Sequence, residues 1–266
     1  IMNCLIFDIE TIPDAELGRK LLELDDSLSD AQVVKKMQEH QLEKKGTEFL
    51  PLHCHKIVAI SAVLANDTQV KVWSIGEVDD DEATLVSRFF AGVEKYQPTL
   101  VSWNGGGFDL PVLHYRALRH KISAPIYWDQ GEKNSAVKWN NYISRYHQRH
   151  TDVMDLVALY QPRAFAPLNE VALLLGYPGK MGMSGSKVAD YYFEGKVNEI
   201  RNYCETDVLN TYLVYLRFEL MRGHLSEKDY NLRIEQLKNT LADSEPEHLK
   251  EFMLSWEKGS CGVEAN

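Results

Sequence analysis

The sequence predicts an α/β domain with a mixed β-sheet flanked by helices, and two features predict it. Short apolar runs typical of strands alternate with segments that show the 3.6-residue apolar period of helices. The first run, Asn3–Thr11, is apolar on both faces at its start, as expected of a central strand. No repeat or long linker divides the chain. We therefore expect one domain over residues 1–222, followed by an acidic helical extension, residues 223–266, packed on it.

The N-terminal half is expected to supply the strands. Two strands are joined by a tight turn at Asn66-Asp67, and another ends at three consecutive glycines, where the backbone can turn sharply. The helix between them carries Leu85, Phe89 and Val93 on one stripe. The expected elements are a polar helical segment at 13–45, strands at Ile57–Ala65, Val70–Ile75 and Thr99–Asn104, and helices at Asp80–Tyr96 and Leu110–Lys121.

The C-terminal half is expected to be helical after an irregular segment that ends at His150. The longest helix is the most clearly marked, because no residue in it breaks the helical apolar pattern. A glycine-rich loop, GYPGKMGMSGSK, separates two of the shorter helices. The expected helices are Val153–Tyr160, Leu168–Leu175, Val188–Glu194 and Val197–Arg222, with a helical acidic tail from Ser226.

The composition is that of a soluble globular protein, with 44% apolar and 26% charged residues among 266. Four scattered cysteines form no Cys-x-x-Cys pair, which indicates a reduced intracellular protein rather than a disulfide framework or a zinc ribbon. No apolar run approaches the roughly 18 residues of a membrane span. We therefore expect a cytoplasmic protein with no membrane association.

The charge is unevenly distributed. The chain carries a net charge of −10, yet Leu110–His150 has seven Lys/Arg against two acids. Trp128, Trp139, Tyr142 and Tyr146 lie among these basic residues. Such a mixture suits phosphate attraction combined with base stacking. A solvated surface insertion explains it as well, and both interpretations stay open.

Two pairs of residues suggest a polar site. In FDIET, Asp8 and Glu10 are two residues apart at the end of a buried strand, so both side chains leave the same face. In YCETD, Tyr203 and Asp207 are one helical turn apart and can address one point. A polar strand end and a Tyr–Asp hydrogen bond in the core are the simpler alternatives. Glu205 projects to another side of the helix and is expected to be solvated.

Asp109 is a further candidate. It is the last residue of WNGGGFD, where a strand ends, the chain turns and a helix begins. An aspartate at a helix start also complements the helix dipole without any further role. The three adjacent glycines match neither Gly-x-Gly-x-x-Gly nor a P-loop, which argues against a nucleotide-binding fold.

Four converging carboxylates would require positive charge. Two unit charges 4 Å apart repel by about 4 kcal/mol at an effective dielectric constant of 20. Oxygen ligands favour hard divalent cations, Mg²⁺ or Mn²⁺. Two such ions would activate a water molecule and stabilise the leaving oxygen of a phosphodiester.

The order FDIET … WNGGGFD … YCETD resembles the three motifs of the DEDD 3′–5′ exonucleases, which have an RNase H-like fold. Tyrosine four residues before the last aspartate matches the DEDDy branch, whereas the DEDDh branch has histidine where this chain has Asn202. The sequence looks most like the exonuclease domain of family-B DNA polymerases and a stand-alone group related to it. HTDVMDL, LNEVALLLGYPGK and GSKV strengthen the resemblance, which spans about residues 1–220.

The resemblance implies a role for each residue of the motifs. Asp8 would bridge two metal ions, Glu10 and Asp207 would complete the site on the side of the nucleophile, and Asp109 would hold the second ion. Tyr203 would orient the attacking water by its hydroxyl group. It would not act as a strong base, since a phenol with a pKa near 10 is mostly protonated at neutral pH.

The resemblance also implies substrate contacts. The backbone of Ile9 and Thr11 would contact the terminal nucleotide, and Asn104 and Phe108 would flank it. The expected substrate is the 3′ end of a nucleic acid, single-stranded DNA being favoured over RNA. A non-catalytic nucleic-acid-binding module and a phosphoesterase acting on small molecules are the alternatives.

Two further pairs of residues have competing interpretations. Lys180 and Lys187, in the glycine-rich segment, could close over a phosphate or belong to a surface loop. Asp152 and Asp155 could enlarge the acidic cluster, but a role at the start of the following helix is favoured.

Overall fold

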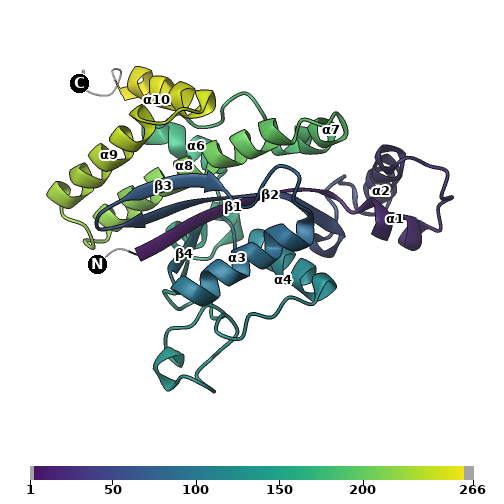
Figure 1. Ribbon diagram of the computed structural model, residues 1–266, viewed down its shortest axis with the longest axis horizontal. Helices are drawn as coiled ribbons and strands as arrows, with labels where there is room; N and C mark the ends of the chain where they lie inside the picture. The colour runs from purple at the N-terminus through teal and green to yellow at the C-terminus, as the bar shows by residue number, and fades with distance from the viewer. Residues whose placement is uncertain (1–2, 261–266) are drawn as a thin grey trace.

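The computed structural model describes residues 3–260 and shows a mixed sheet flanked by helices (Figure 1). The strand order is β3-β2-β1-β4-β5 in the described part of the chain. β1 lies at the centre, antiparallel to β2 and parallel to β4, as the doubly apolar start of this strand predicts. The strands are β1 (Asn3–Pro13), β2 (His55–Asn66), β3 (Val70–Ser74), β4 (Thr99–Ser102) and β5 (His150–Asp152).

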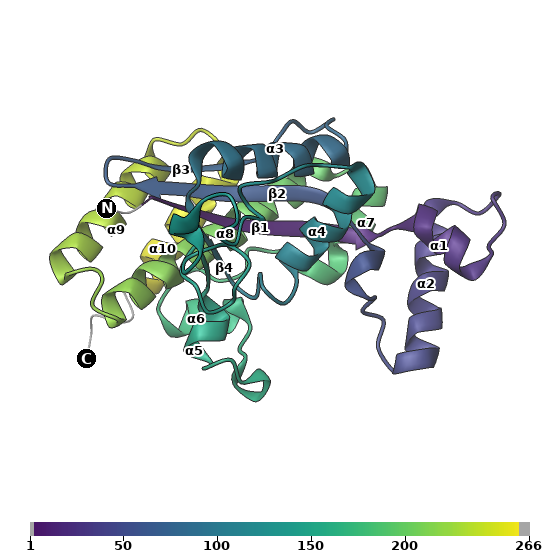
Figure 2. The ribbon, with the colours of Figure 1, turned by 90° about the horizontal axis from the view of Figure 1, so that it is seen from below.

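Helices cover both faces of the sheet (Figures 1 and 2). α3 and α4 pack on one face, and α8 crosses the other, where α6, α9 and α10 surround it. The helices are α1 (Ala15–Leu22), α2 (Asp30–Lys45), α3 (Glu82–Tyr96), α4 (Asp109–His120), α5 (Val153–Val157), α6 (Leu168–Leu174), α7 (Val188–Phe193), α8 (Val197–Met221), α9 (Glu227–Ala242) and α10 (Glu247–Ser260).

Alternation along β1 divides its side chains between two cores. Phe7 and Ile9 join the core under α3 and α4. Cys4 and Ile6 join the core under α8. Because successive side chains of a strand leave opposite faces, the even-numbered residues that follow Ile6 also face α8. The central strand therefore aims Asp8 toward the helix that carries the third sequence motif.

Several elements differ from the expected boundaries by one to three residues, and three of the differences are informative. β5 lies where the sequence predicts the end of an irregular segment, because a strand of three residues is too short to show a periodicity. β4 ends at Ser102, and Asn104 adopts a positive φ of 64° in the turn that follows. α5 ends at Val157, and Leu159 and Tyr160 both have positive φ, which stops the helix.

The C-terminal tail is helical as far as Ser260, as expected, and contributes to the core, whereas residues 261–266 lie outside the described residues. Leu237 of α9 and Leu249, Phe252 and Trp256 of α10 are buried in the same cluster as Leu213 of α8. Helices α9 and α10 contact each other and α8, and α9 also contacts β3. Among the helices of residues 3–260, none is both long and apolar enough to cross a membrane.

Helices α1 and α2 form an arm at one end of the molecule, where β1 leaves the sheet (Figure 1). Gly18 permits their close contact, since a Cβ there would lie 2.2 Å from the sulfur of Met37. The arm is tied to the body by Arg116, which is 3% exposed. Its guanidinium donates to Asp14, the N-cap of α1, at 2.7 Å and to Glu82 of α3 at 2.5 Å.

We predict that Arg116→Ala lowers the free energy of unfolding by about 3–5 kcal/mol, because two buried carboxylates lose their counter-charge. Urea denaturation measures this change. Arg88→Ala is the matched control, since Arg88 forms an exposed ion pair with Asp80 at 3.5 Å. The control should lose less than about 1 kcal/mol. Equal losses in the two variants would show that the buried pairs do not hold the arm.

Candidate active site

The first two carboxylates come from β1. Asp8 and Glu10 project toward α8, and the β1–β2 register shifts between Glu10 and Thr11. Such a bulge bends a strand and redirects the neighbouring side chains. Glu10 is buried, while Asp8 keeps partial exposure.

The third sequence motif meets β1 from α8. Tyr203 is 5% exposed, and its hydroxyl lies close enough to the carboxylate of Asp207 to lower the pKa of that carboxyl group. Asp207 is close enough to Glu10 and Asp8 for its charge to raise their pKa values. The helical spacing of the two side chains therefore places a phenol and a carboxylate at the acidic end of β1.

Asp109 enters from the first turn of α4. Its side chain is 4% exposed, and its Oδ1 accepts the backbone N–H of Ile9 at 3.1 Å. This bond connects α4 to β1 between the two strand carboxylates. The amide of Ile9, which we expected to contact substrate, is thus occupied by Asp109.

The glycine loop that precedes α4 is shaped by Asp152. Its carboxylate accepts the N–H of Asn104 at 3.0 Å and that of Gly106 at 2.8 Å. A Cβ at Gly105 would lie 2.2 Å from the hydroxyl of Ser102, so the turn requires glycine there. Asp152 is also the N-cap of α5, which confirms its expected helix-start role. Asp155 pairs with Arg145 at 2.7 Å.

The pKa values of the four carboxylates are raised because these groups are buried close together. Burial, followed by the charges of neighbouring carboxylates, raises the pKa values of Asp8 and Glu10 well above their usual range. Burial raises the pKa of Asp109 to about 7 and that of Asp207 to about 6. Lys180 lowers the pKa values of Glu10 and Asp207, but one lysine does not balance four acids.

The donor set fits divalent cations. It consists of carboxylate oxygens, which Mg²⁺ and Mn²⁺ prefer, and their mutual repulsion is relieved by positive charge. The sulfur of Cys204, a softer ligand atom that the sequence did not reveal, lies at the edge of the carboxylate cluster. Ligand atoms of Asp8, Glu10 and Cys204 lie within 4.8 Å of one another. The sulfur is 3.7 Å from Asp8 Oδ2.

A cavity of about 680 Å³ opens beside Glu10. One wall is aromatic: the ring of Phe49 lies 5.9 Å from that of Phe108 and 5.2 Å from that of His55, measured between centroids. Phe49 is 57% exposed, although it is a large apolar residue. Lys180 lines the cavity as well, together with Thr11, Asn104, Ser184 and Ser186.

Phe49, His55 and Lys180 complete this cleft, and sequence reasoning assigned no role there to Phe49 or His55. Phe49 lies in the loop after the arm, far in sequence from every motif, so no local signal marked it. Asn104 and Phe108 also line a second opening beside Asp8 and Asp109. Lys187, by contrast, forms an exposed ion pair with Asp190 at 3.4 Å and is not among the residues that line the cleft.

Thr11 and His55 are linked in the wall of this cleft. His55 Nε2 lies 3.1 Å from the carbonyl oxygen of Leu50, which can only accept, so Nε2 carries the proton. The hydroxyl of Thr11 then donates to Nδ1 at 2.9 Å. Burial lowers the pKa of His55, which keeps the ring neutral. The aromatic wall is therefore uncharged.

The basic stretch uses its arginines largely within the fold. Arg119 pairs with Glu16 of the arm, and Arg149 lies over the ring of Tyr142 at 4.8 Å. At the surface, Trp139 is 80% exposed and Tyr146 is 73% exposed. Part of the positive charge between Leu110 and His150 is therefore engaged in contacts within the fold and is not free to bind a ligand.

The expectation that Glu205 is solvated is wrong. Its side chain is 13% exposed and accepts a hydrogen bond from Ser74 at 2.7 Å. His248 of α10 lies 2.7 Å from its other oxygen. The helical pattern shows that Glu205 lies on a different face of α8 from Asp207. It does not show that the C-terminal tail covers that face.

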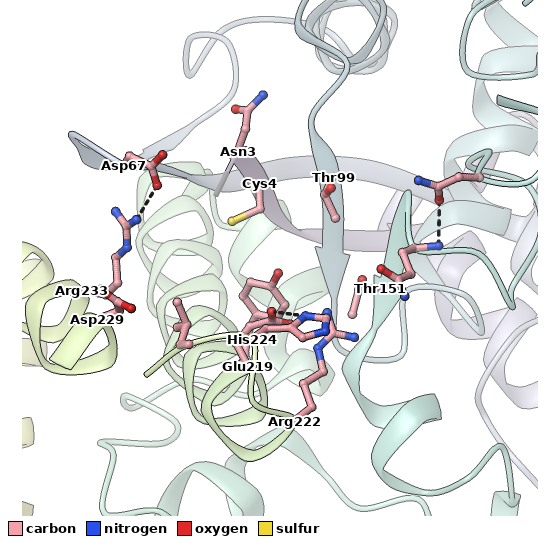
Figure 3. A pocket seen from close by; sticks show the side chains of 14 residues that line it. Asn3, Cys4, Asp67, Thr99, Thr151, Glu219, Arg222, His224, Asp229 and Arg233 are labelled. Carbon is pink, nitrogen blue, oxygen red and sulfur yellow. Dashed lines mark hydrogen bonds and ion pairs between the residues drawn. The ribbon is translucent and has the colours of Figure 1, made fainter. Parts of the chain in front are cut away.

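A separate cavity of about 630 Å³ lies at the opposite end of the central strands, where β1 and β4 begin (Figure 3). Arg222 pairs there with Glu219 at 2.7 Å, and His224 lies 3.1 Å from the same carboxylate. Arg233 pairs with Asp67 at 2.6 Å. These arginines are engaged in the fold and are distinct from the carboxylate site.

The structure is an α/β domain of the RNase H-like class. Its central strand and two of its helices bring four carboxylates and a tyrosine together at one acidic point. Comparison with known families specifies this class further. The model of a family described as predicted 3′–5′ exonucleases related to the exonuclease domain of PolB matches residues 47–256. The chain belongs to this family.

Two relatives agree with this assignment. A DNA polymerase of Archaeoglobus fulgidus is 25% identical over 197 residues, which cover 70% of this chain and 25% of the polymerase. The solved structure of the family B DNA polymerase from Pyrobaculum calidifontis superposes with a TM-score of 0.50 and 17% identity, over 83% of this chain and 25% of that chain. The structural likeness shows the fold. The chain spans about a quarter of the length of each relative.

The raised carboxylate pKa values predict that the metal-free protein becomes less stable as pH rises. The folded state binds these protons more tightly than the unfolded chain, whose aspartates titrate near 4. The stabilisation is therefore present below pH 4 and is lost as pH rises through about 6 and 7, the folded values of Asp207 and Asp109. Thermal unfolding of the metal-free protein should show a falling melting temperature between pH 5.5 and 8.

Asp109→Asn should remove part of this loss and stabilise the metal-free protein at pH 8 by about 1–2 kcal/mol. The asparagine oxygen can still accept from Ile9. Asp26→Asn, at an exposed position, is the control and should leave the pH profile unchanged. Identical profiles for the wild type and Asp109→Asn would contradict the raised pKa.

Proposed function

We propose that this protein is a metal-dependent 3′–5′ exonuclease that hydrolyses phosphodiester bonds from the 3′ end of single-stranded DNA, with two divalent cations, Mg²⁺ or Mn²⁺. The observation that carries the proposal is the convergence of Asp8, Glu10, Asp109 and Asp207 beside Tyr203, with Glu10 lining the adjacent cleft. Family membership supports the class of reaction.

Each carboxylate has a place in this proposal. Asp8 would bridge the two cations, Glu10 and Asp207 would complete one site, and Asp109 would hold the other. When bound, the cations would lower the pKa of a water molecule and stabilise the leaving oxygen. Asp8 and Asp207 keep partial exposure, so cations could reach them from solvent.

Tyr203 would orient the attacking water through its hydroxyl group. Burial, and then the charge of Asp207, raise the pKa of Tyr203 far above neutrality. The phenol therefore stays protonated and acts as a hydrogen-bonding group rather than as a base. The hydroxyl lies beside Asp207, to which it can donate, and its oxygen remains able to accept from water.

The cleft supports a nucleotide strand over a small phosphate ester. Its aromatic wall, formed by Phe49 and Phe108, offers a stacking surface for a base. Lys180 and Ser184 line the same cleft and could contact a phosphate, with Glu10 beside them. A cavity of about 680 Å³ is within the range of ligand sites in proteins. DNA is favoured because the named relatives are DNA polymerases.

The proposal predicts that a 5′-labelled single-stranded DNA oligonucleotide is shortened from its 3′ end in Mg²⁺ or Mn²⁺, and that EDTA abolishes the reaction. Tyr203→Phe should lower kcat by about 10- to 100-fold, the loss of one hydrogen bond to a charged centre. Tyr212→Phe is the matched control, because it removes a buried, unpartnered hydroxyl from the same helix within the described residues.

An intact oligonucleotide under both metals would overturn the exonuclease proposal. Binding without cleavage would then point to a nucleic-acid-binding module. Hydrolysis of a small chromogenic phosphodiester alone would point to a phosphoesterase. An RNA oligonucleotide of the same sequence, run in parallel, reports the preferred sugar.

The cleft predicts a stacking role for Phe49. Phe49→Ala should raise KM for the oligonucleotide by roughly 5- to 100-fold, since stacking of one base on an aromatic ring contributes about 1–3 kcal/mol. The value of kcat should change little, because the ring lies beside the carboxylates rather than among them. Tyr96→Ala, which removes a ring 63% exposed at the end of α3, is the control. An unchanged KM in Phe49→Ala would remove Phe49 from the substrate site.

A further inference from the structure

Glu205 connects the helix of the active site to the C-terminal tail. Ser74 Oγ, at the end of β3, donates to Glu205 Oε1 at 2.7 Å. His248 Nε2, from the first turn of α10, lies 2.7 Å from Oε2. Because an ionised carboxylate only accepts, the imidazole donates from Nε2. Both oxygens of Glu205 are therefore engaged, and the side chains of Glu205 and His248 are only 13% and 15% exposed.

Ser74 continues this connection across the sheet to Asp8. The hydroxyl of Ser61 on β2 lies 3.0 Å from that of Ser74. In the strand register Ser61 is opposite Ser74 on one side and Asp8 on the other. Cross-strand neighbours present their side chains on one face, so the three form a row. Cys204, the residue before Glu205, closes the row with its sulfur 3.4 Å from the carbonyl oxygen of Asp8.

This row opposes a force that the active site creates. Asp207 on α8 and the strand carboxylates Asp8 and Glu10 repel each other whenever they are ionised, which drives α8 away from β1. Glu205 lies between Tyr203 and Asp207 in sequence but is fastened to β3 and α10. Arg201, one turn earlier, donates to the carbonyl oxygen of Gly76 at 2.7 Å and supports the same side of the helix.

Helix α10 is itself firmly placed. Leu249, the neighbour of His248, is 3% exposed, and Phe252 and Trp256 are buried farther along the helix. These three side chains belong to the core cluster that includes Leu213 and Leu216 of α8. His248 is thus held from behind by apolar packing, which lets it act as a fixed donor toward Glu205.

We propose that His248 is a positioning residue for the carboxylate site, and that it acts through Glu205 to hold Tyr203 and Asp207 of α8 at a fixed distance from Asp8 and Glu10. The tail, residues 223–266, thereby gains a role in metal binding through α10. The kinetic part of this inference rests on the proposed exonuclease function, whereas its metal-binding part does not.

The first test is the affinity for Mn²⁺, measured by electron paramagnetic resonance with His248→Ala and His248→Gln. His248→Ala should weaken Mn²⁺ binding by about tenfold, the effect of one lost hydrogen bond to a charged group. His248→Gln should restore most of the affinity, because the glutamine amide can donate from a similar position. On the oligonucleotide, His248→Ala should lower kcat and leave KM within about twofold.

Two further variants test whether His248 positions the carboxylate site or only stabilises the fold. Phe252→Leu alters the core packing of the same helix without touching Glu205. It should lower the melting temperature, whereas Mn²⁺ affinity, measured at a temperature at which the variant is still folded, should be retained. Ser74→Ala removes the other bond to Glu205 and should weaken Mn²⁺ binding as His248→Ala does. It also serves if His248→Ala does not fold.

Wild-type Mn²⁺ affinity in both His248→Ala and Ser74→Ala would overturn the inference, even if both variants melt earlier. Loss of affinity in Phe252→Leu equal to that in His248→Ala would overturn it as well. A wild type that binds Mn²⁺ but cuts no oligonucleotide would refute the proposed function alone, and the affinity series would still decide the role of His248. A wild type that binds no Mn²⁺ would refute both.

Discussion

Repulsion among the carboxylates of Asp8, Glu10, Asp109 and Asp207 is the constraint on which the rest of this structure depends. Burial strengthens that repulsion, and the raised pKa values are its direct expression. Carboxylates on flexible loops would move apart. These four are instead fixed on the central strand and on two helices that pack against the sheet.

Polar contacts help to hold the cluster against this repulsion. The amide of Ile9 donates to Asp109, and the phenol of Tyr203 lies beside Asp207 and lowers its pKa. Asp152 fixes the glycine loop that leads into α4. Farther away, Glu205 fastens α8 to β3 and α10. The arrangement is preorganised for cations, which would supply the attraction that the protein alone lacks.

The cleft beside this cluster is assembled from distant parts of the chain. Phe49 follows the arm, Phe108 precedes α4, and Lys180 belongs to the glycine-rich segment. Arg116 secures the arm to the body through Asp14, and so helps to hold the loop that carries Phe49. Because the arm lies between β1 and β2 in sequence, its attachment links the fold of the strands to the shape of the cleft.

The sequence by itself determined the class of fold and the face on which the motif residues lie. Alternation in β1 and the helical spacing in α8 are local, so they could be read from residue order, and the structure brings Asp8, Glu10, Asp109, Tyr203 and Asp207 together accordingly. Tertiary structure alone decided which partners cover the other faces. Strand β5, the ring of Phe49, the sulfur of Cys204 and the hydrogen bond between Glu205 and His248 depend on contacts between residues distant in sequence. Such contacts leave no periodic trace, because they are set by how packed elements meet rather than by the repeat within any one of them.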